Sequence, residues 1–481
     1  MKDLMLRAMD LATRRGAQYA DVRIVRAAEE DMAVKNGQAY ALNLGESLGF
    51  GVRVLVGGAW GFASSRVLTA EEVDRVTDLA VQIARASEVV NQGRPIDLGP
   101  PVTSQGQYVT PIQIDPFTIT IEDKVALLMA ADAAMSRVKS VKLRQGHLTA
   151  LREDKWFANN EGAFTEQTIY EVGGGIVATA VGGDEVQRRS YPTAMGRQHV
   201  TAGWEAVLAW DLPGHAEPIA SEAMQLLTAK PCPHDIRTTV ILGSDQVALQ
   251  VHESVGHPAE LDRVFGTEAA YAGTSFLTPE KLHTFRFGSQ QVNIIAEAIR
   301  PYGLGTFGWD DEGIPAQSTP VIQDGLLVGY LMSRETASRL GLTSNGCMRA
   351  SSWNRLPLVR MTNVSLEPGA WRLDDLIADT DHGMYLDTNR SWSIDDRRYN
   401  FQFGMEVGYE IKHGKLGRLL RNCSYTGITP EFWNACDAVC NADYWQMWGT
   451  PNCGKGQPLQ IAHTGHGAAP ARFRNVRVGV I

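Results

Sequence analysis

The nine residues from Gln250 to Pro258 constrain the local fold more tightly than any other stretch of this 481-residue chain. They place His252, Glu253 and His257 within six positions, and such groups are the raw material of a metal site with its own proton acceptor. The familiar helical zinc signature has its histidines four residues apart, on one face of a helix. Here they are five apart, which separates them by roughly 140° around a regular α-helix. A shared metal ion therefore requires the helix to be irregular.

The extra residue can be absorbed by a π-type turn or by unwinding at Gly256, directly before the second histidine. Pro258 supports such a distortion, because the residue before a proline is pushed away from α geometry. We therefore predict that the helix is distorted at Gly256 and turns His257 back toward His252.

A catalytic zinc site usually has three protein ligands and keeps its fourth position open. Glu253 follows a ligand directly and suits the role of general base better than that of the third ligand. The other candidates are the cysteines, the remaining histidines and the acidic run Asp310-Asp311-Glu312. Cys453 ranks first. It lies in a glycine-bracketed loop, residues 451–458, which lets the backbone approach an ion closely, and nearby Lys455 would favour the thiolate.

The roles of two other groups of residues stay open at the level of sequence. The acidic run Asp310-Asp311-Glu312 could orient the histidines, hold the amine of a peptide, or only cap a turn. His463 and His466 lie close to the late cysteine in sequence and are a rival source of a ligand, although loop histidines are usually surface residues.

The chain carries four motifs in a fixed order. They are His252-Glu253-x-x-x-His257, Trp309-Asp310-Asp311-Glu312-Gly313-Ile314-Pro315, Arg360-Met361-Thr362-Asn363 with Glu367-Pro368-Gly369, and Cys453-Gly454-Lys455-Gly456-Gln457. Together they resemble the TldD/PmbA family of metallopeptidases, and specifically its TldD-like members that carry the metal motif. The six-residue metal motif alone would be weak support, whereas four motifs in the family's order make the resemblance specific.

This resemblance implies that His252, His257 and Cys453 hold zinc and that Glu253 is the catalytic acid/base. It also implies a preference for small peptides or unfolded segments, which a β-rich domain could bind as a strand added to an exposed sheet edge. The sequence departs from the family at Pro258, where a smaller or more flexible residue is expected. That departure concerns the helix geometry and leaves the ligand set unchanged.

The resemblance further implies a dimer, either of two copies or with a related subunit that lacks the metal motif. The alternative function is therefore a peptide-binding or scaffolding subunit without turnover, which the intact motif disfavours. A redox enzyme is a third idea. It lacks a C-x-x-C pair, and the glycine run 303–308 is not followed by the helix that a dinucleotide site requires.

The length predicts two domains, 1–230 and 231–481, in an α+β fold. The first reads as helices and antiparallel hairpins, with an amphipathic helix over 3–16 and a hairpin signal at Asn36-Gly37. After position 290, short strands alternate with Gly, Asp and Asn turns. We therefore predict a β-rich, barrel-like C-terminal domain that carries one functional helix with the metal motif.

Composition excludes several classes of protein. The formal charge of −9 and the absence of a basic run argue against nucleic-acid binding. The charged N-terminus does not read as a signal peptide, and no apolar run reaches the length of a membrane span. Six cysteines without regular spacing do not form a disulfide framework, so we expect a cytoplasmic protein with free thiols.

Overall fold

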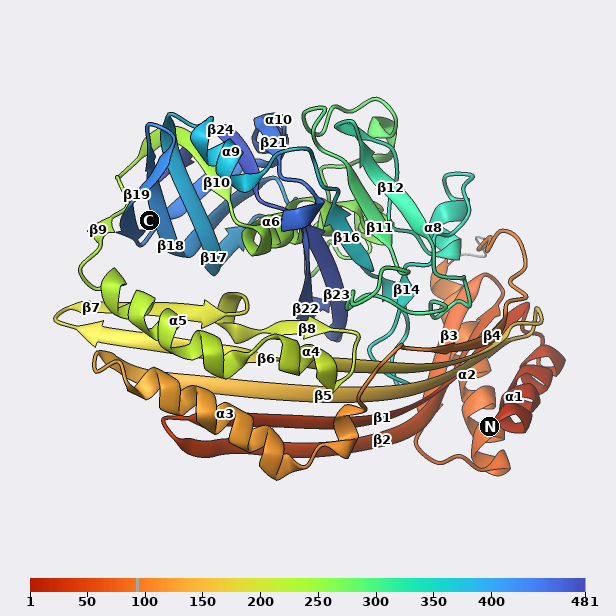
Figure 1. Ribbon diagram of the computed structural model, residues 1–481. Helices are drawn as coiled ribbons and strands as arrows, with labels where there is room; N and C mark the ends of the chain where they lie inside the picture. Colours follow the sequence, from red (N-terminus) through yellow and green to blue (C-terminus); the bar gives the residue numbers. More distant parts are fainter. Residues whose placement is uncertain (92–94, 481) are drawn as a thin grey trace.

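The computed structural model describes residues 1–91 and 95–480, which form two layers (Figure 1). The N-terminal half contributes a long, curved sheet, and the C-terminal half lies against it as a barrel with a second sheet. This mixed arrangement of helices and sheets, with strands dominating the C-terminal half, confirms the predicted fold class.

The N-terminal sheet has the strand order β3-β2-β1-β5-β6-β4, with β7 and β8 paired to β6. Its strands are β1 (Tyr19–Lys35), β2 (Gln38–Val56), β3 (Ala59–Ser65), β4 (Gln105–Val109), β5 (Val141–Asn159), β6 (Phe164–Gly182), β7 (Glu185–Tyr191) and β8 (Gln198–Val200). The hairpin between β1 and β2 turns at Asn36 and Gly37, whose φ angles of 49° and 75° confirm the predicted tight turn.

Helices cover this sheet in two groups (Figure 1). They are α1 (Lys2–Arg14), α2 (Ala70–Asn91), α3 (Ile121–Ser136), α4 (Trp204–Ala209) and α5 (Leu212–Leu226). The first two pack on β1, β2 and β3, and α3 and α5 pack on β1, β5, β6 and β7. In α1 the buried positions Met5, Ala8, Met9 and Ala12 repeat at helical spacing, which is the amphipathic pattern predicted for this segment.

The C-terminal half contains a closed barrel of five strands in the order β17-β10-β24-β20-β18, with β18 pairing back to β17. The strands of this sheet are β9 (Lys230–Pro231), β10 (Ile236–Leu242), β17 (His382–Ile394), β18 (Asn400–Lys412), β19 (Lys415–Arg421), β20 (Ser424–Ile428), β21 (Cys436–Val439) and β24 (Ala471–Val478). The predicted barrel-like domain is thereby confirmed.

A second sheet adjoins the barrel in the order β13-β12-β11-β16-β23-β22, so that β22 is an edge strand. Its strands are β11 (Ile294–Glu297), β12 (Ser318–Gln323), β13 (Leu326–Leu327), β16 (Asn363–Leu366), β22 (Gln446–Lys455) and β23 (Gln460–Ala468), and β14 (Met348–Arg349) pairs with β15 (Leu358–Val359) separately. The short helices here are α7 (Leu261–Val264), α8 (Arg334–Ser338), α9 (Leu373–Ala378) and α10 (Thr429–Asn434).

Helix α6 (Ser244–Val251) lies between the barrel and the second sheet, in contact with β17 on one side and with β16, β22 and β23 on the other. Polar side chains on this buried helix all find partners. Gln246 Nε2 donates to the Tyr425 hydroxyl (2.6 Å), and that hydroxyl donates to Gln250 Oε1 (2.9 Å). Such a satisfied buried network fixes where the helix sits, because breaking any bond would leave an unpaired polar group.

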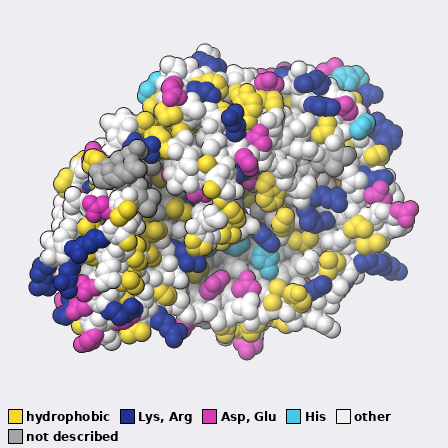
Figure 2. Space-filling model, turned by 180° about the vertical axis from the view of Figure 1, so that it is seen from behind, with side chains coloured by type: hydrophobic (Ala, Val, Ile, Leu, Met, Phe, Trp, Pro, Cys, Tyr) yellow, Lys and Arg dark blue, Asp and Glu magenta, His cyan; other side chains and the backbone are white. Residues whose placement is uncertain are grey.

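The surface mixes both signs of charge. Figure 2, the view from behind, shows Lys and Arg side chains interspersed with Asp and Glu, and a hollow near the middle with histidine side chains in it. Within residues 1–91 and 95–480, no helix combines the length and the apolar character needed to cross a bilayer.

Candidate metal centre

The residues directly after α6 form a π turn, η3 (His252–Gly256), instead of continuing the α-helix. A π turn is closed by a backbone bond from residue i+5 to residue i. Here the His257 N–H donates to the His252 carbonyl, so the two histidines lie one turn apart. Their ring centroids are 4.8 Å apart. The irregular helix predicted from the five-residue spacing is confirmed.

The local cause of the distortion differs from the prediction. Gly256 keeps right-handed dihedrals (φ −58°, ψ −61°), so its conformational freedom is not used. A Cβ at this position would lie 2.1 Å from the Met361 sulfur, and glycine is therefore needed for close packing. His257 also stays in the α region (φ −61°, ψ −45°). The prediction that Pro258 pushes it out of α geometry is wrong.

Three potential ligand atoms converge below this turn, from His252, His257 and Cys453, all within 4.8 Å of one another. The Nε2 atom of His257 lies 3.5 Å from the Cys453 sulfur. Cys453 comes from the edge strand β22, where a register shift after Thr450 bulges the chain. Bulges re-aim side chains in this way next to functional sites. The cysteine ranked first from the sequence is thus brought to the two imidazoles, and all three side chains are buried.

Hydrogen bonds determine which nitrogen of each imidazole carries the proton. His466 Nδ1 lies 2.9 Å from the Val364 carbonyl, which can only accept, so His466 Nε2 has no proton. That atom therefore accepts from His252 Nδ1 at 2.7 Å. His257 Nδ1 donates to the Glu260 carboxylate at 3.1 Å. Both ligand candidates are left with an unprotonated Nε2, the form that binds a metal ion.

The protonation states of all three side chains suit a metal. Burial lowers the pKa of His252 and lowers that of His257 well below its ordinary value, which keeps both imidazoles neutral. Burial alone would raise the pKa of the Cys453 thiol, but the hydrogen bond to His257 Nε2, which can take up the thiol proton, and the charge of Arg360 lower it below its ordinary value. Two neutral imidazoles and a readily formed thiolate are a donor set that fits zinc.

The cation that acts on Cys453 is Arg360, and the prediction for Lys455 is wrong. The Lys455 ammonium is fully buried and committed to carboxylates, at 2.7 Å from Asp262 Oδ1 and 3.3 Å from Glu260 Oε2. Arg360 instead donates to the Cys453 carbonyl. Lys455 therefore acts on the far side of the centre, where it neutralises the carboxylate that holds His257.

Glu253 faces a cleft of about 330 Å³ that the three candidate ligands also line. Its Oε2 atom accepts a hydrogen bond from Arg398 Nη1 at 2.6 Å. Arg398 lies in the turn between β17 and β18 with a left-handed φ of 64°, a conformation that a non-glycine residue adopts only when its surroundings enforce it. Residues 448–454 of β22 form one wall. The ligands, a carboxylate and a strand edge thus share one space.

Family models match three successive parts of the chain. Residues 20–84 match domain 1 of the PmbA/TldA metallopeptidases, residues 114–230 the central domain, and residues 236–479 the C-terminal domain. The chain belongs to this family. The resemblance drawn from four sequence motifs is thereby confirmed.

Relatives of this PmbA/TldA member match from half of the chain to nearly all of it. A metalloprotease of Methanocaldococcus jannaschii is 29% identical over 424 residues, which is 88% of this chain and 89% of that one. A zinc metalloprotease TldD homolog of Saccharolobus solfataricus is 27% identical over 243 residues, 50% of this chain and 51% of its own. The crystal structure of TldE from Thermococcus kodakarensis shares the fold, with a TM-score of 0.75 and 16% identity over 99% of both chains.

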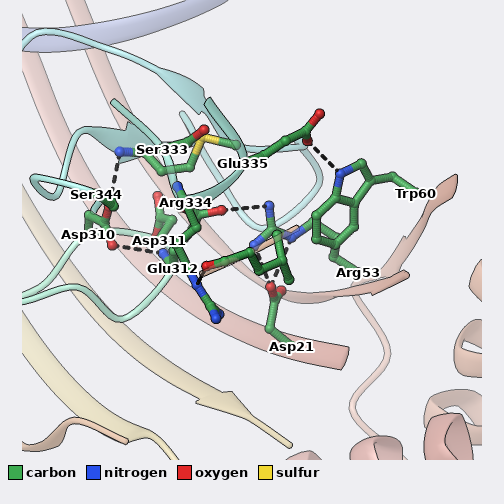
Figure 3. A network of polar contacts seen from close by, with 12 residues as sticks. Asp21, Arg53, Trp60, Asp310, Asp311, Glu312, Ser333, Arg334, Glu335 and Ser344 are labelled. Atoms are coloured by element: carbon green, nitrogen blue, oxygen red, sulfur yellow. Dashed lines mark hydrogen bonds and ion pairs between the residues drawn. The ribbon is translucent and has the colours of Figure 1, made fainter. Parts of the chain in front are cut away.

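The acidic run Asp310-Asp311-Glu312 lies in the contact between the two halves of the chain (Figure 3). Asp311 pairs with Lys155 of β5 at 3.1 Å, and Glu312 lies 3.6 Å from Arg53 of β2. Among the described residues that line the metal cleft, none belongs to this run. In this family member Asp311 and Glu312 join the C-terminal half to the N-terminal sheet, whereas Asp310 accepts hydrogen bonds from backbone N–H groups of its own half, those of Glu312, Ile314 and Met348.

The two late histidines have separate positions. His466 bonds to His252 and so orients a candidate ligand, as described above. His463 lies elsewhere, with Nδ1 2.5 Å from the Glu171 carboxylate of β6. Neither belongs to the group of converging ligand atoms. His466 therefore supports a candidate ligand, whereas His463 contributes a contact between the two halves of the chain.

Sequence reasoning missed Glu260 and Arg398, which hold His257 and Glu253 respectively, and it quoted Arg360 only within a motif, without the role of holding the Cys453 strand. Glu260 follows the motif by three residues, and that spacing was its only signal. Arg398 lies 145 positions from its partner in an Asp-Arg turn that looks like an ordinary hairpin connection. Only the closure of the barrel brings that turn to the metal centre.

Proposed function

We propose that this PmbA/TldA family member is a zinc-dependent peptidase with His252, His257 and Cys453 as ligands and Glu253 as general base. The observation that carries the proposal is the convergence of two unprotonated Nε2 atoms and one thiol with a lowered pKa, beside a carboxylate in a cleft. The names of the relatives described above, which include metalloprotease and zinc metalloprotease, point to the same chemistry.

Each residue of the metal centre has a separate role in the proposed hydrolysis. A zinc ion held by the three ligands would lower the pKa of water and polarise the scissile carbonyl. Glu253 accepts the proton of the attacking water and returns it to the nitrogen of the leaving amine. Arg398 holds the Glu253 carboxylate in position through a charge-assisted bond. His466 and Glu260 keep the imidazoles oriented so that each presents Nε2.

The edge of β22 offers a way to hold the peptide. Gln198 covers the first part of this edge, because its amide donates to the Met447 carbonyl (2.8 Å) and accepts from the Gly449 N–H (3.0 Å). Beyond Gly449 the strand lines the cleft, and within the described residues β22 is paired only with β23. An extended peptide added at 450–454 would lie beside Cys453. Such backbone pairing tolerates many sequences, which suits small peptides or unfolded segments.

The decisive variant is Glu253→Gln, which removes the proton acceptor and keeps the size of the side chain. We expect it to retain a full equivalent of zinc and to cleave unstructured peptides 10²–10⁴-fold more slowly, the usual contribution of a general base. Zinc content and peptide cleavage are measured on the same preparations.

The matched control is Glu431→Gln, an exposed glutamate of α10, which should leave both quantities unchanged. Cleavage by Glu253→Gln at the rate of the unmodified chain would end the proposed mechanism. A chain that binds no zinc would instead support the alternative of a peptide-binding or scaffolding subunit.

A further inference from the structure

We propose that Asp381, His382 and His413 form a second metal site, for a divalent transition-metal ion such as zinc. The cluster lies at the opposite end of the β17–β18 hairpin from Arg398. His382 opens β17, which runs for 13 residues toward the turn at Arg398, or roughly 40 Å at 3.3 Å per residue. The site is therefore distinct from the metal centre and does not rest on the proposed peptidase function.

The side chains already lie near a chelating arrangement. Asp381 stands between the two rings, with Oδ2 2.8 Å from His382 Nδ1 and Oδ1 3.1 Å from His413 Nδ1. All three potential ligand atoms lie within 4.8 Å of one another. Ligand atoms around a tetrahedral zinc ion are about 3.3 Å apart, as bond lengths of 2.0–2.1 Å require. Small rotations about the side-chain bonds would complete the coordination.

The backbone holds these residues together independently of any ion. The His413 N–H donates to the Asp381 carbonyl at 2.5 Å, which joins the turn after β18 to the connection before β17. Gly414, with a φ of 69°, lets that turn approach α9, since a Cβ there would lie 2.5 Å from the Ala378 carbonyl. Preorganisation of this kind reduces the entropy cost of binding an ion.

The donor set indicates the class of ion. Two imidazoles and one carboxylate suit Zn²⁺, Ni²⁺ or Cu²⁺ better than Ca²⁺ or Mg²⁺, which prefer oxygen ligands. The side chains of His382, Asp381 and His413 are 58%, 74% and 70% exposed, so water can fill the remaining positions. Each neutral imidazole would present the lone pair of Nδ1 to the ion and carry its proton on Nε2, which faces solvent. The bound ion would link the connection after α9 to the β18–β19 turn and brace this end of the barrel.

Zinc titration of the metal-free full chain, followed by calorimetry, tests the proposal. We expect two equivalents to bind to the unmodified chain and one to His413→Asn, because an asparagine amide is a poor zinc ligand. Asparagine also tolerates the left-handed φ of 51° at this position. His382→Gln should lose the same equivalent and provides the answer if the first variant does not fold.

Two further variants separate this site from the metal centre. Cys453→Ser should lose the other equivalent, and the double variant Cys453→Ser/His413→Asn should bind none. The matched control is His283→Asn, an exposed histidine with a similar φ of 62° that should leave both equivalents in place. The proposal is overturned if His413→Asn and His382→Gln keep every equivalent of the unmodified chain. Loss that depends on Cys453 alone would support the metal centre and refute the second site.

Discussion

The buried metal centre and the exposed cluster of Asp381, His382 and His413 both bring three potential ligand atoms within 4.8 Å. They differ in what surrounds those atoms. At the metal centre, burial keeps the imidazoles neutral. The Nδ1–H of His252 donates a hydrogen bond to His466, and the Nδ1–H of His257 donates one to Glu260. In the exposed cluster both Nδ1 atoms face the same carboxylate, and the rings are open to solvent.

The difference shows that proximity of donors is not what suits a site to catalysis. The centre adds a carboxylate that is not a ligand, an arginine that holds it, and a cleft with a strand edge. The exposed cluster lies outside that cleft, so an ion there would be suited to bracing the fold. Three predictions test this contrast, each by removing one feature that only the centre has.

The largest effect is expected from the thiolate, which has no counterpart in the exposed cluster. Cys453→Ser should remove the zinc bound at the centre and reduce peptide cleavage to the background rate, because a serine hydroxyl is not deprotonated at neutral pH. Metal analysis and a peptide cleavage assay measure the two effects. Cys436→Ser, at another buried cysteine, is the matched control and should preserve both. Normal zinc content and normal peptide cleavage in Cys453→Ser would show that the Cys453 sulfur is not a zinc ligand.

The next effect concerns the arginine that holds the base. Arg398→Met should lower kcat by roughly 100-fold with the zinc content unchanged, since a misplaced catalytic group costs about that much. Arg397→Met is matched in residue type and loop, and its exposed side chain should be replaceable without loss. Loss of zinc together with activity in Arg398→Met would mean that this residue supports the ligands and does not position Glu253.

The smallest effect is expected from the residue that fixes the proton of His252. His466→Leu removes the acceptor and should weaken zinc binding by 10–100-fold, the range found for partners of metal-bound histidines. His466→Gln offers an amide oxygen as an acceptor and should recover part of that affinity. Competition with a chelator of known affinity gives the numbers. Equal affinity in the two variants would contradict the assigned tautomer.

The sequence predicts those parts of the metal centre that depend on residues close together in the chain. The spacing of His252 and His257 demanded an irregular helix, and a π turn is what the chain forms. The need for glycine at position 256 could not be predicted in the same way, because Gly256 packs against Met361, which lies in a strand connection 105 residues later. Cys453 could be predicted as a ligand from thiolate chemistry and from the family resemblance. Its position on a bulged edge strand could not be predicted.

The fold shows the same division. The Asn36-Gly37 hairpin and the amphipathic first helix follow from local signals and were predicted. Closure of the barrel depends on pairing β17 with β18 and with β10, which lies about 140 residues earlier, and no local pattern encodes that partner. The acidic run Asp310-Asp311-Glu312 likewise gained its partners, Lys155 and Arg53, only from the docking of the two halves.

The proposed metal centre requires that two imidazoles from one turn and a distant thiolate bind the same ion. Zinc K-edge absorption spectroscopy of His413→Asn carrying one equivalent of zinc tests it most directly. We predict one sulfur at about 2.3 Å and two imidazole nitrogens at about 2.0–2.1 Å from the metal. A spectrum with nitrogen and oxygen ligands alone would contradict it.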